Sequence, residues 1–157
     1  MRDVTLCYLV DNENVLLAMK KRGFGVGKWN GFGGKVEPGE SIEDAMIREA
    51  FEETSVKLDK SNLSKVAVID FFFPHKPEWD QKVHVFTAKK WNGYPAESEE
   101  MRPEWFPIKN FPIDKMWPDD PHWLPHILDG KKVRASFVFG KADDILSQDV
   151  KLVEYLE

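Results

Sequence analysis

Residues 34–56, GKVEPGESIEDAMIREAFEETSV, form the segment that decides the fold, and they divide into a loop and a helix. Pro38-Gly39 is a turn dipeptide. Ser41 is a helix N-cap residue, with Asp44 three positions later as the acid of a capping box. Apolar residues then recur at helical spacing, which predicts an amphipathic helix buried along Ile42, Ala45, Met46, Ile47, Ala50 and Phe51.

The other face of this helix is acidic. Glu49, Glu52 and Glu53 stand at i, i+3 and i+4, so their carboxylates converge. Each like-charged i,i+4 pair destabilises an isolated helix by a few tenths of a kcal/mol. A hard cation among the carboxylates removes that cost, and Mg²⁺ prefers oxygen ligands of this kind. The alternative is an ordinary solvated acidic face.

The spacing of the whole segment favours the cation. It runs through Gly34, Glu40, Arg48-Glu49 and Glu52-Glu53. A chance match of these residue types at these intervals is on the order of 10⁻⁵ or rarer. The pattern resembles the box of the Nudix hydrolases, which cleave nucleoside diphosphates linked to another group.

Two positions depart from the family pattern. Ala50 is small where the family has a bulky apolar residue, and Ser55 replaces a late glycine. That glycine suits a left-handed residue at the helix end, so we expect Ser55 to cost about 1 kcal/mol there. The departures concern local packing and leave the acids intact.

Composition restricts the class of protein. The 157 residues suit one domain covering residues 1–157, and the net charge of −5 argues against binding to a nucleic-acid polymer. The single cysteine, Cys7, excludes an internal disulfide and is expected to be a buried, inert thiol. The sequence contains neither a signal peptide's apolar core nor a membrane-spanning stretch, so we expect a cytoplasmic protein.

Strand-like runs occupy much of the remaining chain. We expect strands at 4–10, 15–19, 65–73, 82–89, 102–108 and 132–139, and a short helix at 123–128. Pro103 and Pro107 bound the fifth strand, residues 74–81 form a loop, and the tail from Asp143 is either a last strand or loosely packed. His84 alternates with valines and is interpreted as a sheet residue. With the family resemblance, this order implies the α/β (α+β) Nudix fold: an α/β/α sandwich with a central mixed sheet, the box helix and a C-terminal helix on its faces.

The glycine-rich loop at 23–34, GFGVGKWNGFGG, is neither of the common phosphate-binding motifs. No Ser or Thr follows the lysines of Gly27-Lys28 or Gly34-Lys35, and no helix begins directly after the glycines, so Walker A and dinucleotide motifs are excluded. The small residues instead permit close approach of the backbone to a ligand. The carbonyl of Gly33 could thereby reach a metal held by the box acids.

Further stretches resemble one branch of the family, the animal enzymes that hydrolyse oxidised purine nucleoside triphosphates. These stretches are VLLAMKK at 15–21, KKRGFGVGKWNGFGGKV at 20–36, SEEMRPEWF at 98–106 and MWPDD at 116–120. The resemblance implies hydrolysis of nucleotides such as 8-oxo-dGTP and 2-hydroxy-dATP to the monophosphate plus pyrophosphate. Val4 departs from these enzymes, which carry a tyrosine there.

The resemblance also implies roles for individual residues. Mg²⁺, with Mn²⁺ as a substitute, would be held by Gly33, Glu49, Glu52, Glu53 and Glu100. Glu53 is the first candidate for the group that polarises the attacking water and Glu100 the second, while Arg48 orients the carboxylates. The substrate would be bound by Thr5, Lys20, Phe24, Asn30, Phe32, Gly33, Gly34, Lys35, Phe72, Met101, Trp117, Pro118, Asp119, Asp120, Trp123 and Phe139.

The adjacent carboxyl groups of Asp119 and Asp120 are expected to influence each other's protonation. Two adjacent carboxyl groups in a dry pocket raise each other's proton affinity, so one of them is expected to be neutral near pH 7. A neutral acid donates a hydrogen bond while its ionised neighbour accepts one, and moving the proton would let one pocket read oxidised guanine and oxidised adenine. The alternative is that the pair caps a helix beginning near Pro121.

Two other functions remain open at this stage. The chain could be a Nudix pyrophosphatase of another nucleotide, such as an unmodified dNTP, ADP-ribose or a dinucleoside polyphosphate. It could also be a catalytically silent Nudix-fold module, although such modules usually lose box carboxylates and none is lost here. In each case we expect a monomer that binds a small nucleotide and neither a membrane nor a polymer.

Overall fold

The computed structural model describes residues 1–156, and Glu157, the last residue of the predicted domain, lies outside the described residues. The strands are β1 (Arg2–Asp11), β2 (Asn14–Lys20), β3 (Trp29–Asn30), β4 (Leu63–Phe72), β5 (Gln81–Ala88), β6 (Met101–Pro107), β7 (Lys132–Phe139) and β8 (Ile145–Val153). The α-helices are α1 (Ile42–Thr54) and α2 (Asp120–Leu128), and short 3₁₀ turns occupy Lys60–Asn62, Pro77–Trp79 and Ile113–Lys115.

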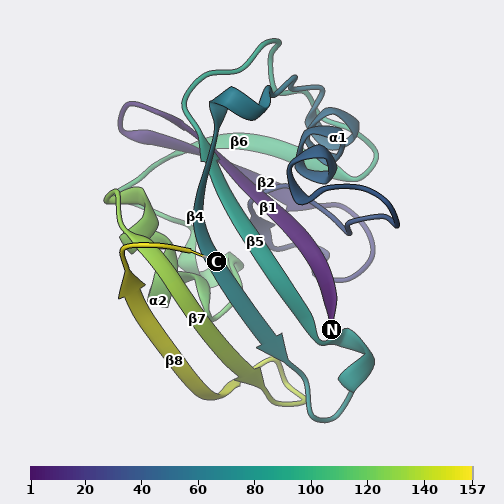
Figure 1. Cartoon of the computed structure of the whole chain (residues 1–157), viewed down its shortest axis with the longest axis vertical. Coiled ribbons are helices and arrows are strands. Elements are labelled where there is room, and N and C mark those ends of the chain that lie inside the picture. Colours follow the sequence, from purple (N-terminus) through teal and green to yellow (C-terminus); the bar gives the residue numbers. More distant parts are fainter. Residues whose placement is uncertain (157) are drawn as a thin grey trace.

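The strands form the predicted mixed sheet, in the order β3-β2-β1-β5-β4-β7-β8 with β6 paired to β2 (Figure 1). The pairs β1–β5 and β4–β7 are parallel, and the other pairs are antiparallel. The tail that the sequence left open is β8, which pairs with β7 along its length. The mixed sheet confirms the predicted fold class.

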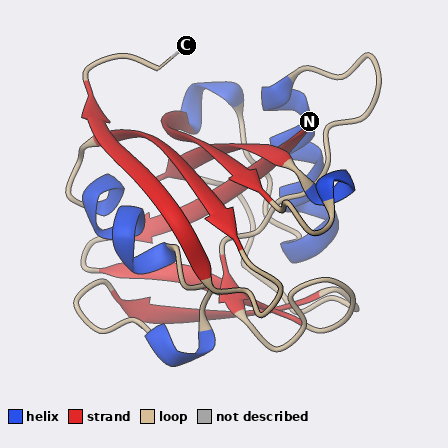
Figure 2. Cartoon of the chain, turned by 90° about the horizontal axis from the view of Figure 1, so that it is seen from below, coloured by secondary structure: helices blue, strands red, loops and turns tan. Residues whose placement is uncertain are grey.

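The two α-helices lie against opposite faces of the sheet, as expected for the sandwich (Figure 2). Neighbouring residues of β1 show this division, because successive side chains of a strand point to opposite faces. Cys7 packs with Met46 of α1, whereas Tyr8 packs with Trp123 of α2. Cys7 is fully buried, and burial raises the pKa of its thiol, as expected of an inert cysteine.

The β1–β2 hairpin opens as it leaves its turn, and a loop fills the opening. Direct pairing of the two strands is confined to the turn end, at Val10–Val15 and Asp11–Asn14. Further along β1, Cys7 bridges to Phe32 and Val4 to Lys35. The second half of the glycine-rich loop is thereby placed against the middle of the sheet. The loop also contains β3, a short strand that the sequence did not predict.

Helix α1 ends and begins as predicted, but its buried face differs in one residue. The Ser41 side chain accepts a hydrogen bond from the Asp44 N–H, and Ser55 adopts a left-handed conformation with φ of 65°. Phe51, predicted to be in the apolar stripe, is 51% exposed and has Lys57 over its ring. The reason is that Phe51 lies about 100° round the helix from buried Ala50.

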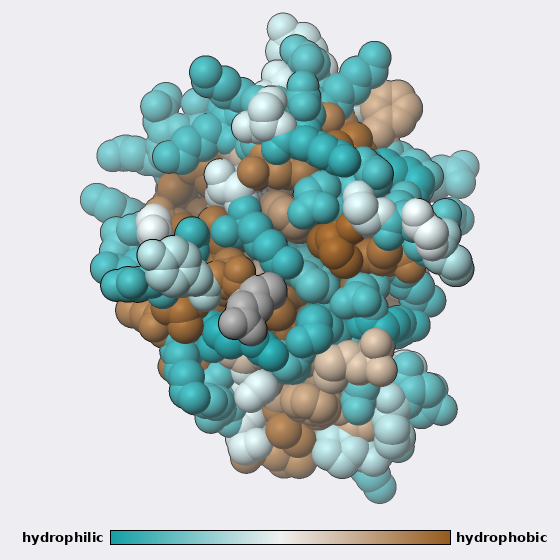
Figure 3. Space-filling view, viewed as in Figure 1, coloured by the Kyte–Doolittle hydropathy of each residue, from teal (hydrophilic) through white to brown (hydrophobic). Residues whose placement is uncertain are grey.

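Two predictions about sheet residues have opposite outcomes. Pro103 lies within β6 and does not bound it, because β6 pairs on one side only and the missing N–H breaks no ladder. His84 lies in β5 as predicted, with its Nε2 2.9 Å from the Asp3 carboxylate. Near it, Asp70 pairs with Arg134 at 2.6 Å. The face of the molecule drawn in Figure 3 carries hydrophilic side chains with hydrophobic patches between them.

Candidate active site

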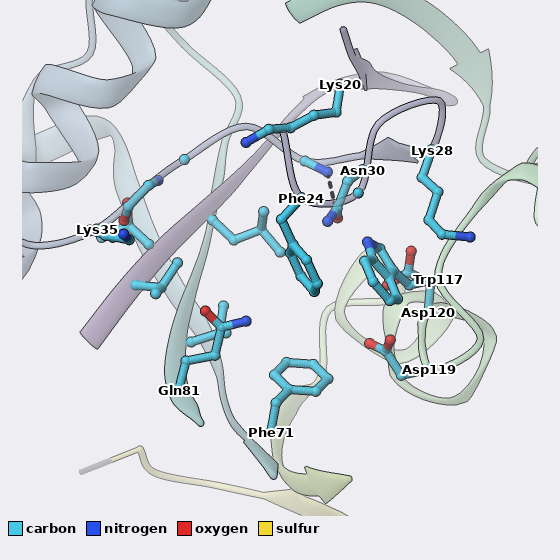
Figure 4. A pocket seen from close by; sticks show the side chains of 18 of the residues that line it. Lys20, Phe24, Lys28, Asn30, Lys35, Phe71, Gln81, Trp117, Asp119 and Asp120 are labelled. Atoms are coloured by element: carbon cyan, nitrogen blue, oxygen red, sulfur yellow. Dashed lines mark hydrogen bonds between the residues drawn. The ribbon is translucent and has the colours of Figure 1, made fainter. Parts of the chain in front are cut away.

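A cavity of about 380 Å³ lies between the glycine-rich loop, the α2 side of the sheet and the start of α2 (Figure 4). It contains most of the residues expected to bind substrate. Those that line it are Thr5, Lys20, Phe24, Asn30, Gly33, Gly34, Lys35, Met101, Trp117, Asp119, Asp120, Trp123 and Phe139. The fold therefore brings residues that are up to 134 positions apart in the chain, from Thr5 to Phe139, to one cavity.

Three expected substrate residues lie elsewhere. Phe32 is fully buried among the side chains under α1, and neither Phe72 nor Pro118 is part of the lining. Phe71 and Phe73 line the cavity in place of Phe72. Alternate residues of a strand face the same side, and Ile69, Phe71 and Phe73 all face the core on the α2 side of the sheet. Three consecutive phenylalanines concealed this alternation in the sequence.

Other lining residues were missed altogether, among them Arg2, Gly25, Lys28, Gln81 and Val83. Gln81 was assigned to a loop, whereas it is the first residue of β5. The alternation of Gln81 with Lys82, Val83 and His84 is the sequence signal that would have placed it on the pocket face.

Asn30 is fixed with its amide group at the pocket. Its Oδ1 accepts hydrogen bonds from the Tyr8 hydroxyl at 3.0 Å and from the Gly31 N–H at 2.8 Å. Both bonds use the carbonyl oxygen, so the amide nitrogen remains available as a donor toward a ligand (Figure 4).

Trp117 forms a flat aromatic wall that its neighbours hold in place. The ring of Phe24 lies 5.1 Å from it between centroids, and Phe139 meets it edge-on at 6.1 Å. The Lys28 Nζ stands 5.1 Å from the centre of the Trp117 ring, within cation–π range. A planar ligand can therefore stack here without much reordering of the pocket.

Asp119 and Asp120 lie at the pocket end nearest α2, and each is only 3% exposed. The Asp119 Oδ2 accepts a 2.8 Å hydrogen bond from the Trp123 indole, while the Asp120 Oδ2 is buried without a partner. Burial raises the pKa of Asp119 to about 6; burial and then the charge of Asp119 raise the pKa of Asp120 well above its usual value. Asp119 occupies the N-cap position but makes no capping hydrogen bond, which disfavours the helix-cap alternative.

The box acids adjoin the other end of the pocket through the glycine-rich loop. The Gly33 N–H donates to Glu53 Oε2 at 3.2 Å, and the Thr5 N–H donates to the Gly34 carbonyl at 2.8 Å. A Cβ at Gly33 would overlap the Thr5 carbonyl, and one at Gly34 would overlap the Glu49 carboxylate. Glycine is thus required at position 33 for the loop to lie against β1, whereas a side chain at position 34 would displace the Glu49 carboxylate.

Glu53 is a buried carboxyl group with a raised pKa. It is 7% exposed, and burial, followed by the nearby Glu49 charge, raises its pKa to about 8. Two carboxyl groups held together in this way need either a proton or a cation between them.

Arg48 links the box helix to the loop that precedes it. Its guanidinium donates to both carboxylate oxygens of Glu40, at 2.7 and 3.0 Å, and to the carbonyl of Lys35 at 3.1 Å. It also donates to Glu49 at 2.9 Å and to Glu52 at 3.2 Å. The hydrogen bonds from Arg48 hold the pKa of Glu40 down at about 2, and Arg48 contacts three carboxylates of the box, those of Glu40, Glu49 and Glu52.

The five predicted metal ligands are only partly assembled. Glu49 and Glu53 adjoin the loop backbone at Gly33, but Arg48 binds Glu52 and Arg22 binds Glu100. Within residues 1–156, no three His, Cys, Asp or Glu side chains stand ready around one point. The candidate donors fit Mg²⁺, since they are carboxylate and carbonyl oxygens. The carbonyl belongs to Gly33, where the close approach of the backbone to Thr5 leaves no space for a Cβ.

The fold and this arrangement of acids define a Nudix enzyme, and the comparison with known proteins agrees. The NUDIX domain family matches residues 1–127, and the chain belongs to the Nudix hydrolase family. The sequence is 47% identical over 150 residues to the oxidized purine nucleoside triphosphate hydrolase of Mus musculus, covering 96% of this chain and 94% of that protein. It is 46% identical over 153 residues to the protein of the same name from Danio rerio, covering 98% and 96%.

Solved structures show the same fold. The MutT protein of Bacillus halodurans superimposes with a TM-score of 0.83 at 27% identity, over 96% of this chain and 98% of that one. The MutT Nudix hydrolase of Burkholderia pseudomallei gives a TM-score of 0.64 at 26% identity, over 71% and 86%. No helix among residues 1–156 is long and apolar enough to cross a membrane.

Proposed function

We propose that this Nudix hydrolase cleaves oxidised purine nucleoside triphosphates, such as 8-oxo-dGTP and 2-hydroxy-dATP, to the monophosphate and pyrophosphate, and so cleans the nucleotide pool. The observation that carries the proposal is the pair Asp119 and Asp120, buried beside Trp117 at the end of the pocket away from the box acids. The names of the mouse and zebrafish relatives support the same substrate class.

The base-binding end is built to read a purine edge in more than one form. Asn30 offers an amide donor, and the raised pKa values of Asp119 and Asp120 favour one shared proton near neutral pH. The protonated carboxyl donates and the ionised one accepts. Moving the proton exchanges these roles, which suits the different donor patterns of oxidised guanine and oxidised adenine.

The phosphate end supplies charge and base chemistry. We propose that Glu49, Glu52, Glu53, Glu100 and the Gly33 carbonyl hold Mg²⁺, with Mn²⁺ as a substitute. The bound ion would neutralise phosphate charge. Glu52 and Glu100 would have to leave Arg48 and Arg22 to take part.

Glu53 takes the proton of the attacking water in this scheme. Its pKa of about 8 in the metal-free chain reflects burial and the neighbouring Glu49 charge, and a cation beside it would lower that value. Arg48 fixes the direction of Glu49 from the opposite side. We further propose that the chain acts as a cytoplasmic monomer.

A panel of nucleotides tests the proposal. The purified chain is incubated with Mg²⁺ and 8-oxo-dGTP, 2-hydroxy-dATP, dGTP, ADP-ribose and a dinucleoside polyphosphate, and kcat/KM is measured with separate detection of pyrophosphate and phosphate. We expect the two oxidised nucleotides to be preferred and pyrophosphate to be released. Preference for ADP-ribose or a dinucleoside polyphosphate would replace the proposed substrate, and absence of any turnover would indicate a silent module.

A further inference from the structure

We propose that Gln81 is a further substrate-positioning residue, whose carboxamide reads the oxidised N7–C8 edge of an 8-oxopurine. This inference rests on the proposed function and names one chemical feature of the substrate that the pocket selects. It does not involve the carboxyl pair or the box acids.

The position of Gln81 follows from the register of three strands. As the first residue of β5, it pairs with Arg2 of β1 on one side and with Phe71 of β4 on the other. Alternation along β5 directs Gln81 and Val83 to the pocket face and Lys82 to the opposite face. Gln81 is therefore held by two neighbouring strands, on a rigid part of the fold.

The surroundings of Gln81 are mainly apolar. Phe71, Val83 and Phe139 also line the cavity. In Figure 4, Gln81 lies across the pocket from Trp117 and the two aspartates, with Phe71 between them. The side-chain hydrogen bonds among the described residues do not include the Gln81 carboxamide. A half-buried donor and acceptor is thus available to a ligand on a mainly apolar wall, beside the Arg2 side chain of the neighbouring strand.

The chemistry of oxidation at C8 matches this group. An 8-oxopurine presents an N7–H donor beside a C8 carbonyl acceptor, whereas an unmodified purine presents an N7 acceptor beside a C–H. A carboxamide has one acceptor and one donor side by side, so it can form two hydrogen bonds with the oxidised edge. A site built to hydrogen-bond a polar edge discriminates strongly against analogues that lack that edge.

The two oxidised nucleotides named above differ in this respect. The modification of 2-hydroxy-dATP is on the six-membered ring, and its N7–C8 edge is that of ordinary adenine. Gln81 should therefore favour 8-oxopurines specifically, while the carboxyl pair serves both kinds of substrate.

The test compares Gln81→Leu with the unmutated chain on 8-oxo-dGTP and 2-hydroxy-dATP, both with Mg²⁺. We expect Gln81→Leu to lower the ratio of kcat/KM for 8-oxo-dGTP to kcat/KM for 2-hydroxy-dATP about tenfold. This is the usual effect of losing one net hydrogen bond or slightly more. Gln81→Glu keeps an acceptor for the N7–H, loses the donor to the C8 carbonyl and opposes the N7 lone pair of 2-hydroxy-dATP, so it should lower the ratio less than Gln81→Leu does. An unchanged ratio, or an equal loss on both substrates, would overturn the proposal and leave Gln81 as a packing residue.

Binding of the reaction products gives a readout that is independent of turnover. Calorimetry with metal-free protein should show weaker binding of 8-oxo-dGMP to Gln81→Leu by about tenfold, with a smaller change for 2-hydroxy-dAMP. Gln148→Leu makes the same chemical change at an exposed position of β8 and should alter neither affinity. Failure of the proposed function is distinct, because the unmutated chain would then prefer neither oxidised nucleotide. An equal fall in both affinities would contradict the role of Gln81.

Discussion

The two ends of the active site both contain buried carboxyl groups but balance them in different ways. At α1, Arg48 binds three glutamates directly, and Glu49 and Glu53 lie beside the backbone of Gly33 and Gly34. At the start of α2 no basic side chain is hydrogen-bonded to Asp119 in the described chain; it has the indole of Trp123. The first end is suited to metal and phosphate, and the second to protons and a base.

In the proposed function, this difference separates catalysis from recognition. Charge at the α1 end is balanced by ions, which is useful where phosphate must be held and attacked. Charge at the α2 end is reduced by protonation, which is useful where a neutral ring must be read by hydrogen bonds. Substitutions at the two ends should therefore affect different kinetic constants.

The largest effect is expected for Glu53→Gln. Loss of a general base typically costs 10²–10⁴ in rate, so we expect kcat to fall about 10³-fold with KM changed little. Steady-state kinetics with 8-oxo-dGTP at saturating Mg²⁺ measures both constants. A variant with normal kcat and a greatly raised KM would show that Glu53 serves binding and not catalysis.

A smaller effect, about 10²-fold in kcat/KM, is expected for Asp119→Asn, which removes an acceptor from a buried hydrogen-bonded pair. Asp120→Asn should change the same constant but shift the preference between 8-oxo-dGTP and 2-hydroxy-dATP differently, since the two groups exchange donor and acceptor roles. Asp129→Asn, at the exposed far end of α2, is the matched control. If both pocket variants kept full activity on every oxidised purine, the shared-proton account would be wrong.

The buried acids also predict how stability depends on pH. Glu53 is an acid whose folded pKa, about 8, lies above its ordinary value of 4.5, so the folded state holds the extra proton between these values. The contribution of Glu53 to the stability of the metal-free chain must fall as the pH rises through this window, by roughly 3–4 kcal/mol between pH 5 and pH 8. Urea unfolding in EDTA at pH 5 and pH 8 should show the fall, Glu53→Gln should reduce it, and Mg²⁺ at pH 8 should reverse part of it. If the contribution of Glu53 to the free energy of unfolding grew with rising pH in the metal-free chain, the predicted direction of the pH dependence would be wrong.

The smallest effect concerns the end of α1. Ser55 has φ of 65°, a conformation that glycine adopts without strain, so Ser55→Gly should stabilise the fold by about 1 kcal/mol. Ser55→Ala keeps the Cβ and should give no such gain. Thermal unfolding at fixed pH compares the two variants. Equal stabilities would show that relief of backbone strain does not explain the glycine that the family has at this position.

Regions of the site differed in how far the sequence predicted them. The box acids were identified in full because one helix carries them, and helical spacing alone brings Glu49, Glu52 and Glu53 to one face. Their pairing in the structure was less predictable, because the partners Arg22 and Glu100 come from separate loops. The fold class was inferred from strand order and resemblance, and the sheet confirms it.

The recognition pocket was predicted less completely because it is assembled from many elements. Trp117 and the aspartates were found through their short motif, but Phe71 and Gln81 depend on the pairing of β4 with β5. A run of three phenylalanines carries no alternation, and a strand that begins one residue earlier than expected moves Gln81 from a loop into the pocket wall. Register, which is a tertiary property, decides such positions.

Calorimetric titration of 8-oxo-dGMP into the metal-free Glu53→Gln and Asp119→Asn proteins tests most directly the separation of catalysis from recognition. The account predicts that Glu53→Gln binds the monophosphate as tightly as the unmutated chain, within about twofold, while Asp119→Asn binds it at least about tenfold more weakly. Equal loss of affinity in both variants, or loss in Glu53→Gln alone, would contradict it.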